Sequence, residues 1–272
     1  MTTESLFDLL RLARTAALRA AGPLDRLSAL ARGPGDRPPL WLRRHAGPLA
    51  AHESSAREMD AWIGELGLVR EGDRVVDLGC GAGAMAAPLA RRLGPAGSYL
   101  GLDVHRPSIS WASRHFAADR RVAFEAVAAA SPYGGGRGPS NGRSALPVAE
   151  GAAQFVLAKS LFTHLLEADA AAYLSEIRRI LEPGRAALVT AFLFERGSRA
   201  DRGLSRSFRH PEPGRPVRWR LRHRPESAVA YERTFFLALV QRAGLREQWI
   251  CESFLPGDDD VPRGQDLVLL GV

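Results

Sequence analysis

Three glycines follow closely on an acidic residue in the stretch DRVVDLGCGAGAMA, at residues 73–86. Gly79, Gly81 and Gly83, here called the glycine turn, let the chain turn sharply and let backbone N–H groups approach a ligand that a Cβ would hold away. Asp103 comes 24 positions after Gly79, at the end of the apolar run YLGLD. A carboxylate at that place can accept both hydroxyls of a ribose. The spacing predicts a site for a nucleotide-like molecule.

Asp77 decides which nucleotide-like molecule fits best. The glycines alone also suit a dinucleotide, since Gly79, Gly81 and Ala84 satisfy the pattern G-x-G-x-x-A. A dinucleotide would bring its pyrophosphate against the Asp77 carboxylate, and like charges repel strongly in a dry pocket. S-adenosylmethionine carries a ribose, an ammonium and a sulfonium but no phosphate. The acid therefore favours S-adenosylmethionine, and an NAD-dependent oxidoreductase is the weaker alternative.

These residues lie in a chain that alternates predicted strands and helices. Short apolar runs are typical of buried strands, and a strong helical pattern covers residues 168–181. Such alternation predicts a doubly wound α/β fold, with a mostly parallel sheet and helices on both faces. Its ligand lies outside the carboxyl ends of the strands, where the glycine turn falls. The predicted strands are 74–78, 98–102, 122–127, 154–158 and 186–192, and the other predicted helices are 54–68, 84–93, 107–116 and 231–244.

The composition is that of an ordinary soluble protein with an excess of basic residues. The 272 residues are 46% hydrophobic and carry a formal net charge of +7, which indicates a globular chain. Lys159 is the only lysine, and the many arginines occur beside abundant Ala and Gly. We attribute this to GC-rich coding bias rather than to binding of nucleic acid. Cys80 and Cys251 allow at most one disulfide and no metal cluster, so we expect a reducing cytoplasm.

Residues 1–53 are predicted to form a helical extension and linker before a main domain at 54–272. Apolar residues recur at helical spacing near the start, and GPGDRPP at 33–39 interrupts the pattern. Because Glu4 and Asp8 lie in the first helix, we expect neither a signal peptide nor a membrane span. The helix is expected to pack on the domain, with docking to a membrane surface as the alternative.

The motifs together resemble those of the class I S-adenosylmethionine-dependent methyltransferases. VVDLGCGAG resembles the first motif of that family and YLGLDV the second, while FVLAKSLFTHL and YLSEIRRILEPGRAALVTAF resemble its fourth and fifth strand regions. The resemblance covers roughly residues 54–194, and residues 245–272 match the closing antiparallel hairpin of the family. It implies a seven-stranded, Rossmann-like sheet with S-adenosylmethionine as cofactor.

The resemblance also implies a role for each residue of the cofactor site. The glycine turn, with Cys80, holds the methionine part, and Asp77 lies near its amino group, directly or through water. Asp103 takes the ribose, Val104 packs on the adenine, and Ser160 lies in the wall that faces the sulfonium. The alternative for Asp77 and Asp103 is that they cap turns.

Three places depart from the pattern of the family. Relatives carry an acid just after the third strand, where this chain has Ala128 and Ala129. They have Phe-Asp before the fourth strand, where this chain has Ala153 and Gln154, and their L-x-P-G-G becomes LEPGR at 181–185. A noncatalytic S-adenosylmethionine-binding partner protein is therefore the alternative from a different class.

Methyl transfer asks little of side chains, because the sulfonium is already an activated electrophile and orientation supplies much of the rate. A base is needed only where the nucleophile must lose a proton. His164, just past the fourth strand, is the candidate base, and the alternative is a histidine hydrogen-bonded within the fold. The run Asp258, Asp259 and Asp260 is more typical of a solvated loop than of a metal site, so we predict no metal.

Substrate recognition is expected in two segments outside the shared core. SPYGGGRGPSNGRSALP at 131–147 is predicted to be a flexible loop. Residues 195–230 hold ten arginines and two histidines, and we expect a lid in which Arg209 and His210 receive an anionic or polar acceptor. A solvated basic face is the alternative. Within this lid, residues 217–222 alternate as in a strand with one buried and one wet face.

The sequence thus predicts methyl transfer to a hydroxyl or amine of a small metabolite or glycan precursor in a bacterial biosynthetic pathway. An RNA or protein acceptor is the other enzymatic alternative, but the chain has no interleaved aromatic platform for RNA. We expect a small-molecule partner, with nucleic acid an unlikely one.

Overall fold

The computed structural model describes residues 52–127, 145–205, 207–211, 214–255 and 264–272, with Ala17, Ala20, Ala21, Pro23, Pro38, Pro39 and Leu42. Most of the predicted N-terminal extension and of the 131–147 loop lies outside these residues. So do Ala128, Ala129 and the run Asp258 to Asp260. The division into an extension and a main domain stays a prediction.

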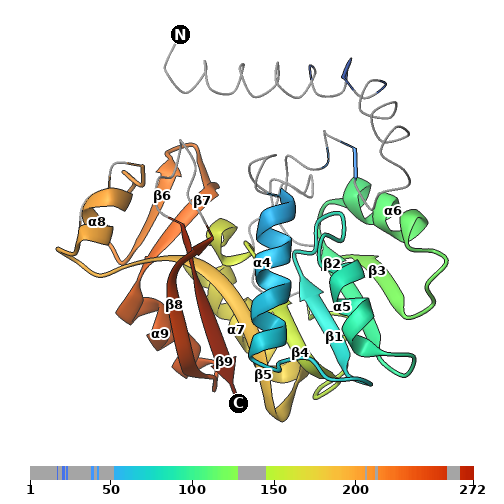
Figure 1. Cartoon of the computed structure of the whole chain (residues 1–272). Coiled ribbons are helices and arrows are strands. Elements are labelled where there is room, and N and C mark those ends of the chain that lie inside the picture. Colours follow the sequence, from blue (N-terminus) through green and yellow to red (C-terminus); the bar gives the residue numbers. More distant parts are fainter. Residues whose placement is uncertain are drawn as a thin grey trace.

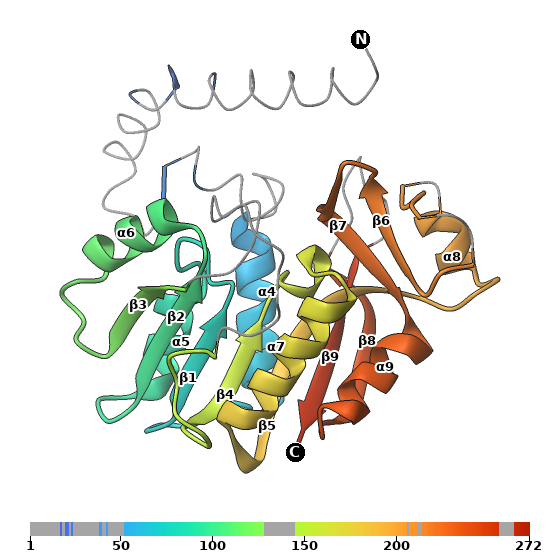
Figure 2. The same ribbon diagram turned by 180° about the vertical axis from the view of Figure 1, so that it is seen from behind.

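The described chain forms one large sheet flanked by helices (Figure 1, and from behind in Figure 2). The strands are β1 (Arg74–Leu78), β2 (Ser98–Asp103), β3 (Val122–Ala126), β4 (Ala153–Ala158), β5 (Leu181–Phe194), β6 (Val217–Leu221), β7 (Arg224–Glu232), β8 (Arg246–Leu255) and β9 (Gln265–Gly271). The helices are α4 (His52–Glu65), α5 (Ala86–Leu93), α6 (Arg106–His115), the short 3₁₀ helix η2 (Phe162–His164), α7 (Glu167–Ile180), α8 (Arg199–Leu204) and α9 (Arg233–Arg242). Among the described helices, none is both long and apolar enough to span a membrane.

The strand order confirms the predicted doubly wound sheet. Strands β3, β2, β1, β4 and β5 lie side by side and are parallel. Strand β9 then pairs antiparallel with β5, and β8 pairs antiparallel with β9. The predicted closing hairpin is therefore confirmed, with β9 between β5 and β8. Strand β5 is longer than predicted, because Leu181 already pairs with Ala153 and the strand continues to Phe194.

Both faces of the sheet are buried, which explains why its strands are apolar throughout. Val75 and Val76 are adjacent in β1 and point to opposite faces. Val75 packs with α4 and α5 in one cluster, and Val76 packs with α7 and α9 in another. Leu89 and Leu93 of α5 and Met59 and Ile63 of α4 fill the first cluster; Leu174 and Ile177 of α7 and Phe236 and Val240 of α9 fill the second.

The sheet has two more strands than the seven expected, and both lie mainly in the segment predicted to be a lid. After β5 the chain forms α8 and then the antiparallel hairpin of β6 and β7, here called the β6–β7 hairpin. Strand β7 pairs parallel with the last three residues of β5, from Phe192↔Ala230 to Phe194↔Glu232. The sheet therefore continues into this segment. Helix α9 begins at Arg233 rather than at Tyr231, because Tyr231 and Glu232 still belong to β7.

The prediction of a wet face on β6 is wrong for Arg218. Its side chain is only 12% exposed and donates from Nη1 to Oδ1 of Asp201 at 2.5 Å. The guanidinium also lies over the ring of Phe194, 4.0 Å from its centroid, an arrangement that favours a cation. Helix α8 supplies Asp201 and covers this face, so the hairpin is packed on both sides.

Candidate functional site

The glycine turn connects β1 to α5 at the carboxyl edge of the sheet. Gly79, Gly81 and Gly83 have φ angles of 75°, 57° and 80°, a region that only glycine enters freely. The amides of Gly79 and Cys80 donate to the carbonyl of Leu102 at 2.8 and 3.2 Å, and the amide of Gly83 donates to the carbonyl of Cys80 at 2.9 Å. These amides are thus paired within the protein, unlike the expectation that they face the ligand. The glycine turn is therefore fixed to the end of β2 by its own backbone bonds.

Asp103 ends β2 directly beside the glycine turn. Its Oδ2 accepts a hydrogen bond from the amide of Gly81 at 2.7 Å, and its Oδ1 accepts one from the amide of His105 at 2.7 Å. These are capping bonds, the alternative role considered from the sequence. Each carboxylate oxygen has a second lone pair. The bonds therefore fix the carboxylate and leave acceptor capacity for the two hydroxyls of a ribose.

Asp77 is a buried acid with a strongly shifted pKa. It is 2% exposed in β1, and the hydroxyl of Tyr99 on β2 donates to its Oδ2 at 2.7 Å. Burial raises the pKa of Asp77 to about 7, although the bond from Tyr99 and the charge of Lys159 lower it. The carboxyl group is thus about half protonated at neutral pH, and a bound cation would ionise it.

Lys159 follows β4 directly and brings a cation to the same site. Asp77 is the register partner of Leu157, and alternation puts Lys159 on the same face of β4 as Leu157. Burial lowers the pKa of Lys159, while the charges of Asp77 and of Glu58 on α4 raise it. An ammonium and a carboxyl group therefore lie within electrostatic reach of each other beside the glycine turn.

Ser160 holds the turn after β4 in a strained conformation. It is a non-glycine residue with a φ of 58°, which costs free energy and concentrates at functional sites. Its amide donates to Oγ1 of Thr190 at 2.7 Å, and its hydroxyl donates to Oε1 of Gln265 at 3.0 Å. The Thr190 hydroxyl donates to the same Gln265 oxygen at 2.7 Å. Strands β5 and β9 thus fix this turn from two sides.

His164 ends η2 and contacts the β6–β7 hairpin. Its Nδ1 lies 2.8 Å from the carbonyl oxygen of Glu226, and because a carbonyl can only accept, we assign the proton to Nδ1. Burial lowers the pKa of His164 and the charge of Arg220 lowers it further, while the Glu226 carbonyl and Asp103 raise it. The ring is therefore neutral at pH 7, with its basic lone pair on Nε2.

A buried hydroxyl also joins the β6–β7 hairpin to η2. Tyr231 on β7 donates from Oη to the carbonyl of Phe162 at 3.1 Å and to that of Leu165 at 2.5 Å. The hairpin therefore lies directly against η2, at the carboxyl edge of the sheet. The charge of Asp103 at the end of β2 also raises the pKa of His164, so this carboxylate lies within electrostatic reach of η2.

The contacts of four other predicted site residues do not identify their roles. Cys80 is buried, which raises the pKa of its thiol, and Val104 is partly buried directly after Asp103. Arg209 is exposed, and His210 pairs with the backbone of Trp219 at the edge of β6. The roles of these four residues stay predictions.

Sequence reasoning missed three residues that interact electrostatically with the site. Tyr99 and Lys159 act on Asp77 across strands, and Tyr173 of α7 feels the charge of Asp103. Burial chiefly raises the pKa of Tyr173 to about 12. For Lys159 a signal existed, since a single lysine at the end of a buried strand is unusual in an arginine-rich chain.

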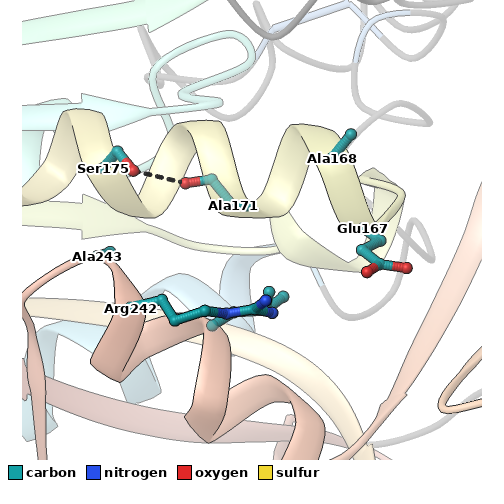
Figure 3. A pocket seen from close by; sticks show the side chains of 7 residues that line it. Glu167, Ala168, Ala171, Ser175, Arg242 and Ala243 are labelled. Carbon is teal, nitrogen blue, oxygen red and sulfur yellow. Dashed lines mark hydrogen bonds between the residues drawn. The ribbon is translucent and has the colours of Figure 1, made fainter.

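One pocket lies away from this region, between α7 and α9 (Figure 3). It measures about 430 Å³ and shares no residue with the site described above. Within the described ranges, no group of three or more His, Cys, Asp or Glu side chains is arranged to hold a metal ion.

Gly101 of β2 is expected to be required for the packing of the glycine turn. A Cβ at this position would lie 2.7 Å from Cδ1 of Phe124 and 2.8 Å from Sγ of Cys80. Gly101→Ala should therefore lower the free energy of unfolding by about 2 kcal/mol, measured by urea denaturation. Gly203→Ala in α8 is the control, because its Cβ would meet nothing within 4 Å and should stabilise the helix slightly. Equal stability of the two variants would contradict the packing argument.

The comparisons with known proteins agree on the kind of domain. Residues 76–184 match a family model described as a methyltransferase domain. The fold is similar to a SAM-dependent methyltransferase from Aquifex aeolicus, at 17% identity and a TM-score of 0.50, over 80% of this chain and 97% of that one.

Two further similar structures contain small molecules. One is geranyl diphosphate C-methyltransferase from Streptomyces coelicolor, at 14% identity and a TM-score of 0.55, over 85% of this chain and 83% of that one. The other is 1,6-didemethyltoxoflavin-N1-methyltransferase from Burkholderia thailandensis, at 15% identity and a TM-score of 0.55, over 84% and 82%. Both were solved with S-adenosylhomocysteine.

Proposed function

Because the chain belongs to the class I S-adenosylmethionine-dependent methyltransferases, we propose that it methylates a hydroxyl or amine of a small molecule bound between the glycine turn, η2 and the β6–β7 hairpin. The single observation that carries this proposal is His164. A neutral histidine with its proton on Nδ1 lies at the carboxyl edge of the sheet, within electrostatic reach of Asp103. Such a ring can accept the proton of a hydroxyl.

The charges beside the glycine turn fit the methionine part of the cofactor. That part is an α-amino acid, with one ammonium and one carboxylate. Asp77 would receive the ammonium, and Lys159 would receive the carboxylate. Asp103 would take the ribose hydroxyls with the lone pairs that its capping bonds leave.

The chain's own residues would align the acceptor and move one proton. When bound, the cofactor supplies an activated methyl group on a sulfonium. His164 would take the proton from an acceptor hydroxyl at Nε2, and the carbonyl of Glu226 would hold the ring in the required tautomer. Ser160 and its bonds to Thr190 and Gln265 would fix the wall beside the reacting atoms.

The packing of the hairpin supports a small acceptor. Arg218 and Tyr231 fasten the part of the hairpin away from its tip to α8 and η2, so this part forms a wall beside η2. The similar methyltransferases solved with geranyl diphosphate and with 1,6-didemethyltoxoflavin act on small molecules, which supports the same class here.

The experiment that tests this function has two steps. Calorimetry should show micromolar binding of S-adenosylmethionine and S-adenosylhomocysteine and none of NADH. Release of S-adenosylhomocysteine is then measured over a panel of small hydroxyl and amine compounds. Binding without turnover on any compound, tRNA and total protein included, would favour the noncatalytic partner protein, and NADH binding would overturn the assignment of Asp77.

Lys159→Met is expected to weaken cofactor binding about tenfold. The variant keeps the unbranched aliphatic chain and removes the charge that faces the carboxylate, a loss of about 1.4 kcal/mol. Decarboxylated S-adenosylmethionine provides the check, because without a carboxylate it should bind wild type and variant alike. An equal loss for both ligands would show that Lys159 does not meet the carboxylate.

A further inference from the structure

We propose that the indole N–H of Trp219 and the hydroxyl of Ser227 form a polar subsite for the acceptor, and that this subsite selects a hydroxycarboxylate. The inference rests on the proposed function, since it names the substrate class of the same site. It is carried by atoms that the fold buries without a hydrogen-bond partner.

Three buried side-chain atoms have no hydrogen-bond partner within the described part of the chain. They are Nε of Arg218, Nε1 of Trp219 and Oγ of Ser227. All three belong to the β6–β7 hairpin. A buried polar group without a partner costs free energy, so such groups are rare and call for an explanation. Arg218 points to the opposite face of β6 from Trp219, where its Nη1 bonds Asp201 and Ser205, so its Nε is not part of this subsite.

Trp219 and Ser227 lie on the face of the hairpin that meets η2. Trp219 is the register partner of Val229, and both pack in the cluster that contains Phe162 and Tyr231. Ser227 precedes Val229 by two positions, which puts it on the same side of β7 and diagonal to Trp219. The next residue toward the hairpin tip, Glu226, accepts the bond from His164.

The chemistry of these groups defines what would pair with them. An indole N–H can only donate, and a serine hydroxyl can also donate, so the partner must bring oxygen lone pairs. Arg220 of β6 places a positive charge near His164. The two donors of Trp219 and Ser227 suit a carboxylate, while His164 takes the proton from a neighbouring hydroxyl. A hydroxycarboxylate presents both groups.

Entry of this acceptor requires a small displacement of the hairpin tip. Both unpartnered atoms are buried, whereas the base of the hairpin is held by the two bonds of the Tyr231 hydroxyl. The tip is held at η2 by the bond between His164 and Glu226. The acceptor would therefore enter between η2 and the tip.

The first test measures stability without any ligand. Ser227→Ala removes a buried hydroxyl that has no partner, so the Tm of the free protein should rise by about 2 °C. Ser108→Ala is the matched control, because that buried hydroxyl bonds Nδ1 of His105 at 2.7 Å and its loss should lower the Tm. A fall in Tm for Ser227→Ala would show that this hydroxyl is satisfied in the free protein and would overturn the inference.

The second test observes the indole directly. In ¹⁵N-labelled protein saturated with S-adenosylhomocysteine, the signal lost in Trp219→Phe identifies Trp219 among the five tryptophans. Salicylate, mandelate and citrate serve as hydroxycarboxylate probes, and benzylamine and methyl α-glucoside as controls. We expect at least one hydroxycarboxylate to shift this signal and Ser227→Ala to weaken that probe at least fivefold.

The outcomes separate this inference from the proposed function. If S-adenosylhomocysteine binds but no hydroxycarboxylate shifts the Trp219 signal, the subsite is wrong and the cofactor site stands. A shift caused by benzylamine or the glucoside alone would overturn the substrate class. If S-adenosylhomocysteine does not bind, the proposed function fails, and this inference fails with it.

Discussion

Asp77→Asn should lose about 100-fold in affinity for S-adenosylhomocysteine while making the free protein more stable at neutral pH. The affinity falls because a charged hydrogen bond to the ligand's ammonium is worth about 2–3 kcal/mol in a dry site. Asparagine keeps the shape of the side chain, and its amide oxygen can still accept the bond from Tyr99. The loss therefore reports the charge rather than a disturbed fold.

The stability gain follows from the raised pKa of Asp77. The unfolded carboxyl loses its proton near 3.8 and the folded one near 7, so the folded state binds more protons between these values. Stability therefore falls as the pH rises from about 4 to about 7 and is constant above. Asparagine removes this penalty, with a gain on the order of 4 kcal/mol above pH 7 that disappears below pH 4. Thermal unfolding over this pH range measures it.

The same pKa predicts how cofactor affinity depends on pH. Below about pH 7 the carboxyl must lose a proton before it can receive an ammonium, so the affinity of the wild type should rise about tenfold per pH unit there. The cofactor affinity of the Asp77→Asn variant should not change with pH in this range. Asp119→Asn is the control. Asp119 pairs with Arg121 before the start of β3, at the opposite edge of the sheet from the glycine turn, so this variant should bind the cofactor as the wild type does. A flat wild-type profile would contradict the ionisation of Asp77 on binding.

His164→Asn should lower turnover at least 100-fold on a hydroxyl acceptor while leaving cofactor affinity unchanged. The amide nitrogen of asparagine can replace Nδ1 as donor to the Glu226 carbonyl, so the hairpin stays in place. What the variant loses is the basic Nε2, and a positioned base contributes about 10²–10⁴-fold. The measurement is kcat and KM with the first compound that gives turnover in the panel.

A second substitution separates catalysis by His164 from its role in holding the hairpin. His164→Phe fills the space but cannot donate to Glu226, so it should lose both turnover and acceptor binding. In the wild type, kcat should fall as the pH drops through the depressed pKa of His164, because protonation removes the base, and the Asn variant should not show this step. If His164→Asn retains full kcat, the histidine is structural or the acceptor is an amine that needs no base.

The parts of the site that the sequence predicted are local in the chain. The glycine turn follows β1 directly, and Asp103 ends β2, so strand endings and glycine spacing locate both. The contacts around Asp77 are different. Tyr99 lies in β2 and Lys159 directly follows β4, and the register of the sheet brings both within reach of Asp77. No local pattern contains that register.

The packing of the predicted lid, residues 195–230, was likewise not predictable from local sequence. Its alternating arginines indicate a strand, and β6 confirms the strand. The alternation was taken to put the arginines in water, but α8 lies over this face and Asp201 neutralises Arg218. An alternating pattern predicts that the two faces of a strand differ. It does not predict that a charged side chain is buried, because burial requires a partner of opposite charge, which can be distant in the sequence.

Strand β5 begins beside β4, in the half of the sheet that we propose for the cofactor, and ends beside β7, in the half that we propose for the acceptor. The segment that forms α8, β6 and β7 leaves this strand after Phe194 and returns at Glu232, and these two residues are register partners. The segment is thus a cassette whose two ends lie next to each other on the scaffold. We therefore expect that a related segment with the same two ends, and with the bonds to η2 kept, could replace this one, which offers a route for selection, or for an engineer, to change the substrate while keeping the chemistry.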